Sequence, residues 1–178
     1  MNYKQMMWED HHYRFGLAGE GQADSIQALL EGSSGLVLNI GCGPDGSKLA
    51  RLASHCKRQI AVDRDLDIVR RARDRCAAAN VAFVVADAHK LPFTDGCAEH
   101  VVALGLFAYV TDPVGVFREF RRVTKSHVTI TNSVSNPLET HKHAGEEAGL
   151  TLVDKSEGYC PAASGEIKRR YMLVFINN

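Results

Sequence analysis

The chain has 178 residues, 45% of them hydrophobic, which is enough to bury one sizeable core and favours a single globular domain. Lysine plus arginine equals aspartate plus glutamate at 21 each, so the formal charge is zero and no overall positive field favours nucleic acid or an anionic membrane surface. The longest apolar runs are far shorter than the roughly 20 residues of a membrane-spanning helix, which argues against an integral membrane protein.

The N-terminal leader differs from the rest of the chain in composition. Its first residues, MNYKQMMWEDHHYRF, contain no apolar signal region, so we expect a cytoplasmic protein. Trp8 and Tyr13 lie among further aromatic side chains and methionines, and a helix is predicted at 23–32. His11 and His12 are adjacent but have no matching acid cluster, and the five cysteines form no CxxC pair, so we predict no metal site.

From residue 35 onward, short β-like runs alternate with segments of helical period, as in an α/β domain with a largely parallel sheet. Seven strands are predicted, at 36–40, 58–63, 81–86, 100–105, 127–132, 150–158 and 169–177. Helices are predicted at 46–55, 65–79, 112–123 and 138–148. Asn80 is the expected left-handed cap of the second helix, and Pro113 suits the first position of the third. No helix-length segment separates the last two strands, so they should form an antiparallel hairpin.

The loop after the first strand reads Gly41-Cys42-Gly43-Pro44-Asp45-Gly46 and fits the dinucleotide pattern GxGxxG. Pro44 removes one backbone N–H, and Asp45 places a negative charge near the position of a pyrophosphate. Gly41 and Gly43 still allow close backbone approach, because no Cβ intervenes. The loop therefore favours a nucleotide ligand without a phosphate.

Two acids follow the next two strands. Asp63, twenty residues after Gly43, ends the second strand and can accept hydrogen bonds from both hydroxyls of an unphosphorylated ribose. This feature fits NAD equally well. Asp87 follows the third strand, at the sheet edge where open α/β folds hold their ligands.

The segments VLNIGCGPDG, AVDRD and ADAHKLPFTDG occur in this order, and with them residues 35–178 resemble the class I S-adenosylmethionine-dependent methyltransferases. The similarity is greatest to the small ubiquinone-biosynthesis-like, or type 11, group. It implies a Rossmann-like, seven-stranded, mostly parallel sheet in the order 3-2-1-4-5-7-6, with helices on both faces and an antiparallel seventh strand. It also implies S-adenosylmethionine as cofactor, S-adenosylhomocysteine as product, and residues 1–34 as a lid and helix packed on a methyltransferase domain at 35–178.

The resemblance assigns cofactor contacts to the following residues: Asn39, Gly41, Cys42, Gly43, Asp63, Arg64, Asp87, Ala88, Leu104 and Gly105. Gly41 and Gly43 would line the methionine moiety, Asp63 would hold the ribose, and Asp87 with the Ala88 N–H would hold the adenine. Leu104 and Gly105 would lie near the methyl group. Asn39 stands where the family usually has an acid, so an amide dipole replaces a charge attraction.

The predicted substrate contacts are Trp8, Tyr13, Phe107 and Tyr109. No catalytic base is assigned, because methyl transfer needs chiefly an in-line nucleophile held in position. A small molecule or a protein side chain is the expected acceptor. An RNA methyltransferase and a non-catalytic, methyltransferase-like binding or regulatory protein are the alternatives, the second because of Asn39. Neither nucleic acid nor membrane is an expected partner, and a homodimer is one way to close the site.

Overall fold

The computed structural model describes residues 30, 33–133, 138–161 and 167–178. Within these residues the strands are β1 (Ser33–Ile40), β2 (Cys56–Asp63), β3 (Val81–Val85), β4 (Ala98–Leu104), β5 (Thr124–Ser133), β6 (Thr151–Pro161) and β7 (Ile167–Ile176). The helices are α3 (Gly46–Ala53), α4 (Leu66–Arg75), the 3-10 helix η1 (Leu106–Tyr109), α5 (Pro113–Val123) and α6 (Leu138–Glu147). Each strand overlaps one of the predicted runs.

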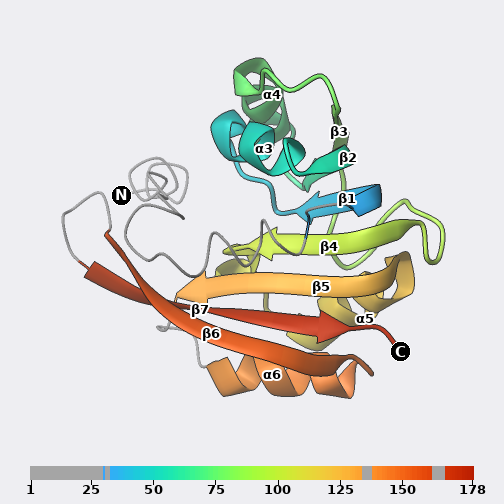
Figure 1. The fold of residues 1–178 in the computed structure, drawn as a ribbon, viewed down its shortest axis with the longest axis vertical. Coiled ribbons are helices and arrows are strands. Elements are labelled where there is room, and N and C mark those ends of the chain that lie inside the picture. Colours follow the sequence, from blue (N-terminus) through green and yellow to red (C-terminus); the bar gives the residue numbers. More distant parts are fainter. Residues whose placement is uncertain (1–29, 31–32, 134–137, 162–166) are drawn as a thin grey trace.

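The seven described strands form one sheet in the order β3-β2-β1-β4-β5-β7-β6 (Figure 1). Strands β1 to β5 pair in parallel, whereas β7 pairs antiparallel with both β5 and β6. The predicted order and the predicted terminal hairpin are therefore confirmed. Because the parallel strands share one direction, the loops that follow β1 to β4 all lie at the carboxyl ends of the strands, on the same side of the sheet.

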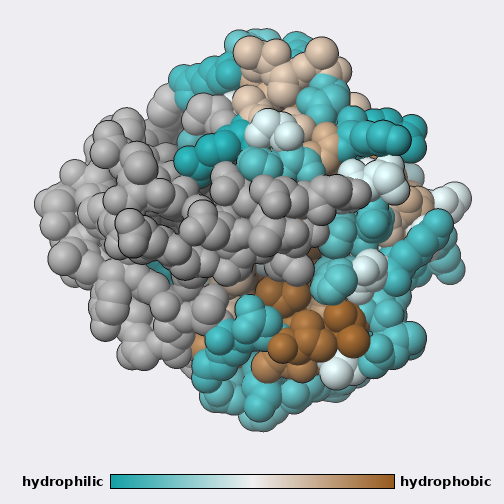
Figure 2. Space-filling model, viewed as in Figure 1, coloured by the Kyte–Doolittle hydropathy of each residue, from teal (hydrophilic) through white to brown (hydrophobic). Residues whose placement is uncertain are grey.

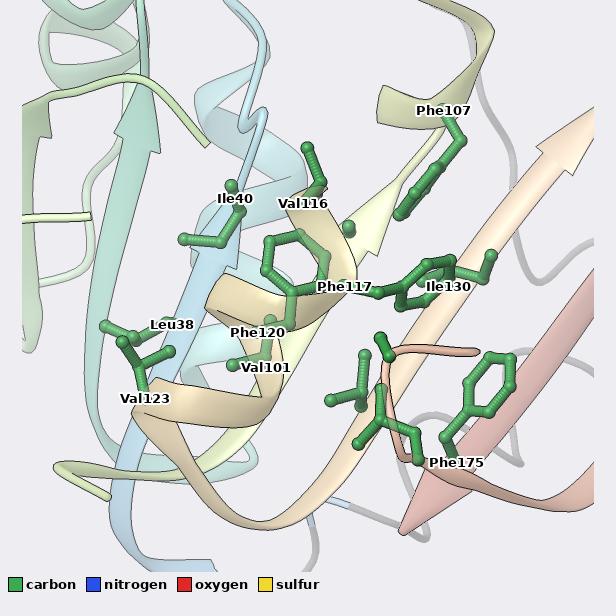
Figure 3. Close-up of a cluster of buried hydrophobic side chains, with 14 of the residues drawn as sticks. Leu38, Ile40, Val101, Phe107, Val116, Phe117, Phe120, Val123, Ile130 and Phe175 are labelled. Carbon is green, nitrogen blue, oxygen red and sulfur yellow. The ribbon is translucent and has the colours of Figure 1, made fainter. Parts of the chain in front are cut away.

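Helices cover both faces of the sheet, as the side chains of β1 show. Val37 belongs to a buried cluster that contains Leu30 and Leu52, whereas Leu38, its neighbour, packs in a cluster that contains Phe117 of α5 (Figure 3). Successive side chains of a strand point to opposite faces, so α3 and α5 lie on opposite sides of the sheet. The α5 side holds the larger aromatic core (Figure 3).

Helix α4 ends earlier than predicted. It stops at Arg75, and Cys76 is already extended, with φ −93° and ψ 112°. Asn80 does not cap the helix in a left-handed conformation, since the described residues with positive φ are all glycines. Instead its side-chain amide donates to the carbonyl oxygens of Ala53 at 2.8 Å and Cys56 at 2.9 Å. Asn80 therefore ties the start of β3 to the junction of α3 and β2 and does not belong to the end of α4.

The start of α5 agrees with the prediction, because Asp112 caps it through a bond from the Gly115 N–H at 2.9 Å, with Pro113 at the first position. Leu30, from the predicted leader helix, is helical and buried. The remainder of residues 1–32 lies outside the described chain. No helix among the described residues is long and apolar enough to cross a membrane.

The described surface on the face in Figure 2 is largely hydrophilic, with a compact hydrophobic area in the lower half, where Figure 1 places β6 and β7. Val153 of β6 is half exposed. Strand β6 is an edge strand, at the opposite end of the sheet from β2 and β3.

Candidate functional site

A pocket of about 650 Å³, including the open space at its mouth, lies where the loops after β1, β2, β3 and β4 meet. Eight residues predicted from the sequence line it: Gly41, Asp63, Arg64, Asp87, Ala88, Leu104, Gly105 and Tyr109. The structure thus brings the glycine loop and both predicted acids together at one site.

The glycine loop depends on backbone conformations that other residues avoid. Gly41 and Gly43 have φ of 69° and 64°, in the left-handed region. The Gly41 N–H donates to the Val62 carbonyl at 2.8 Å, which ties the loop to the end of β2. A Cβ added at Gly41 would lie 2.8 Å from Cδ1 and 3.0 Å from Cβ of Leu106, so a side chain at this position would require the Leu106 side chain, the loop or η1 to shift.

Asp63 is the central carboxylate of the pocket. Its Oδ2 accepts from the Gly43 N–H at 3.2 Å, and its Oδ1 accepts from the Asp65 N–H at 3.2 Å. Burial raises the pKa of Asp63 above its usual value, and these backbone donors offset the rise only in part. A ligand that brings further hydrogen-bond donors would therefore stabilise the ionised carboxylate.

Asp87 is more exposed than Asp63 and has a different environment. Its Oδ1 accepts from the backbone N–H of His89 at 2.8 Å and from Nδ1 of the same residue at 2.9 Å. The His89 backbone N–H and then its ring hold the pKa of Asp87 below the usual range, and Arg64 adds a smaller attraction. Asp87 is therefore an ionised acceptor at neutral pH.

The loop after β4 forms the apolar wall of the pocket. Gly105, with φ 84°, turns the chain into η1, and its N–H donates to the Thr131 carbonyl at 2.8 Å. Leu106 and Tyr109 of η1 line the pocket, with Tyr109 42% exposed. Phe107 points into the core instead, where its ring stacks on Phe117 with centroids 4.6 Å apart (Figure 3). The structure therefore separates Phe107 from the pocket.

Three predicted cofactor residues are not among those that line the pocket: Asn39, Cys42 and Gly43. Asn39 is buried on β1. The Cys42 side chain packs with Leu49 and Ala72, and burial, with a smaller effect of Asp63, raises the pKa of its thiol, so the thiol stays neutral. Gly43 acts through its N–H on Asp63.

Two histidines of α6 do not line the pocket, and two predicted substrate residues lie outside the described residues. His141 of α6 is buried, and its Nδ1 meets the hydroxyl of Tyr171. His143 is not among the residues that line the pocket. Trp8 and Tyr13 lie outside the described residues. Within the described chain, no group of three or more histidine, cysteine, aspartate or glutamate residues could hold a metal ion.

Five lining residues were not predicted from the sequence: Ile40, Ala86, His89, Leu106 and Val110. Ile40 and Ala86 directly precede predicted site residues, so strand ends alone could have indicated them. His89 lies in the segment ADAHKLPFTDG, two residues after Asp87, a spacing that allows a side chain to return to the carboxylate.

The comparisons with known proteins agree with this geometry. The sequence model of the methyltransferase domain family matches residues 38–131, slightly more than half of the chain. The matched range contains all the residues that line the pocket. No curated protein matches the chain by sequence.

Solved structures share the fold at low sequence identity. A SAM-dependent methyltransferase from Aquifex aeolicus has a TM-score of 0.74 at 14% identity, with 100% of both chains covered. The N-methyltransferase NodS from Bradyrhizobium japonicum has a TM-score of 0.70 at 18% identity, with 87% of this chain and 94% of that chain covered. A chain solved in complex with the Trm112 methyltransferase activator of Haloferax volcanii has a TM-score of 0.72 at 20% identity, with 87% of each chain covered.

Proposed function

The chain belongs to the class I S-adenosylmethionine-dependent methyltransferases, and from this premise we propose that it methylates a small molecule or a protein side chain. The observation that carries the proposal is the pocket in which the glycine loop, Asp63 and Asp87 meet beside an apolar wall. When bound, S-adenosylmethionine supplies a methyl carbon attached to a positively charged sulfur. A nucleophile can attack this carbon without covalent help from the protein.

The residues of the pocket fit this cofactor by their chemistry. Asp63 is a half-buried carboxylate with a raised pKa, and two ribose hydroxyls are donors that would stabilise its charge. Asp87 would accept from the adenine amino group, and the Ala88 N–H would donate to the ring. Gly41 and Gly43 would leave room for the methionine moiety, with Asn39 and Cys42 behind the loop and Arg64 beside the ribose.

The chain's own part in the reaction is to bind, to orient and to exclude water. Leu104 and Gly105 lie at the end of β4 and would flank the methyl group, while Leu106 and Val110 extend the apolar wall. In this setting a nucleophile held in line about 3 Å from the methyl carbon would react by displacement. Tyr109, exposed at the pocket, is the described residue that we assign to the acceptor.

Residues 1–34 complete the proposal as a lid. The leader carries Trp8 and Tyr13, whose apolar surface would cover the acceptor and limit the access of water. Deletion of residues 1–20 is expected to leave a folded domain that retains the cofactor poorly and transfers no methyl group. A truncated protein with the full rate of transfer would contradict the lid.

The proposed ribose contact can be tested with two neighbouring acids. Asp63→Ala removes an acceptor of two charge-assisted bonds, each contributing roughly 1.5 to 3 kcal/mol, so S-adenosylmethionine affinity should fall by at least about tenfold. Asp65→Ala is the matched control, because Asp65 accepts from the Asp67 N–H at 2.8 Å at the start of α4 and does not line the pocket. Calorimetric titration should show wild-type affinity in Asp65→Ala. Wild-type affinity in Asp63→Ala as well would contradict the ribose assignment.

The acceptor class can be found with labelled cofactor. We would incubate the protein with S-adenosylmethionine labelled in the methyl group and with separate metabolite, protein and RNA fractions of a cell extract. The proposal predicts label in the metabolite or protein fraction, with Tyr109→Ala reducing the transfer. Label confined to the RNA fraction would contradict the proposed acceptor class while leaving the cofactor assignment intact.

A further inference from the structure

We propose that His89 is a positioning residue for adenine recognition: it occupies Oδ1 of Asp87 and so presents Oδ2 of the same carboxylate to the pocket. The inference rests on the proposed function, in which Asp87 accepts from the 6-amino group of adenine. It adds a residue that orients the acceptor of this hydrogen bond.

The geometry begins with the two bonds that end on one oxygen. The backbone N–H of His89 lies 2.8 Å from Oδ1 of Asp87, and Nδ1 of the His89 ring lies 2.9 Å from the same atom. An ionised carboxylate only accepts, so the ring donates through an Nδ1 that carries a proton. Two donors fill the two lone pairs of Oδ1, and Oδ2 is left for a donor from the pocket.

The backbone around this carboxylate is also held. The Lys90 N–H donates to the Asp87 carbonyl at 3.0 Å, and the same two residues form an isolated β-bridge, so residues 87–90 make a closed turn. The Asp87 side chain is 60% exposed, and the two hydrogen bonds to its carboxylate, at 2.8 Å and 2.9 Å, both come from His89. Removal of the ring donor would leave Oδ1 held by the His89 backbone N–H alone, so the carboxylate would move more freely, and adenine binding would then have to order it further.

His89 is placed to act on the pocket from the side. Its ring is 40% exposed, and the residue lines the pocket next to Ala88 and Asp87. The ring could therefore contribute in two ways, as a hydrogen-bond donor to Asp87 or as a flat wall against a bound purine. The proposal assigns it the first role, because the Nδ1 to Oδ1 distance is that of a well-formed hydrogen bond.

Two substitutions separate these roles. His89→Asn keeps an N–H donor attached to Cγ, at the position of Nδ1, and removes the ring. His89→Phe keeps an aromatic ring and removes the donor. The two ligands are S-adenosylhomocysteine and its 6-deamino analogue, whose purine carries a hydrogen atom in place of the amino group. The analogue keeps the ring nitrogens, so only the bond to Asp87 changes.

Calorimetric titration should show that the wild-type protein prefers S-adenosylhomocysteine to the analogue by about tenfold or more, the usual effect of a charge-assisted hydrogen bond. His89→Asn should keep this ratio, whereas His89→Phe should lower it roughly threefold to tenfold without a change in melting temperature. A wild-type ratio in His89→Phe, or an equal loss of the ratio in both variants, would overturn the inference.

Asp87→Ala distinguishes this failure from that of the proposed function. If Asp87→Ala keeps the wild-type ratio between the two ligands, the adenine contact itself is wrong. If Asp87→Ala loses the ratio while His89→Phe keeps it, the adenine contact stands and His89 has no positioning role.

Discussion

Gly41→Ala is the sharpest test of the close approach between the glycine loop and η1. Gly41 has φ 69°, and alanine in the left-handed region costs roughly 1 to 2 kcal/mol. The added Cβ would also lie 2.8 Å from Cδ1 of Leu106, against the roughly 3.5 Å of an ordinary carbon contact, so the Leu106 side chain, the loop or η1 must move by about 0.7 Å. The bond from the Gly43 N–H to Asp63 is already 3.2 Å long, so a movement of the loop by this amount would break it.

The expected result is a cofactor dissociation constant about tenfold higher and a melting temperature lower by several degrees, since 1 kcal/mol corresponds to roughly 2 to 4 °C in a chain of this size. Gly96→Ala is the matched control. Gly96 has φ 58°, but its added Cβ would lie 3.5 Å from the nearest atom, Cγ of Lys125, in ordinary contact. Gly96→Ala should lower the melting temperature and leave cofactor affinity unchanged. Equal affinity of both variants for S-adenosylmethionine, measured by calorimetry, would refute the reasoning.

Several residues that line the pocket could be predicted because of where they stand in the sequence. Asp63 ends an apolar strand, Gly41 and Asp87 follow apolar strands almost directly, and a parallel sheet brings the carboxyl ends of its strands together. Strand order needed more than periodicity, because alternation of strands and helices does not say which strands are neighbours. The order came from the resemblance carried by three motifs, and the structure confirms it.

The apolar wall could not be predicted in the same way. Phe107 and Tyr109 are two residues apart in a 3-10 helix of four residues, which is too short for a repeating pattern to show the buried side. Phe107 is buried because the rings of Phe117 and Phe120 lie beneath it, and both belong to a different helix. Leu106 reaches Gly41 only through the left-handed turn at Gly105, a tertiary approach that no local pattern shows.

Two further predictions concern the core beneath the site. Phe107→Ala should lower the free energy of unfolding by roughly 3 to 5 kcal/mol, the usual cost of deleting a buried aromatic ring. Tyr109→Ala should leave the free energy of unfolding nearly unchanged and reduce methyl transfer. Equal destabilisation of the two variants in urea would contradict the placement of the two rings. The last prediction concerns pH, because burial lowers the pKa of both His141 and His100, the second with a smaller effect of His127. An unfolded histidine titrates near pH 6.5, so below about that pH the unfolded chain binds protons that the folded chain does not, and stability falls as the pH drops toward the folded pKa values. The free energy of unfolding in urea should therefore be lower at pH 5.5 than at pH 7.5, a range above the ordinary pKa values of aspartate and glutamate. The raised pKa of Asp63 acts in the opposite sense, so the contribution of one histidine is read from a variant that lacks it. His141→Gln removes one of these groups, so the difference between the two pH values should shrink in that variant whatever its own stability. A variant with an undiminished difference between the two pH values would show that His141 is not held neutral by the fold.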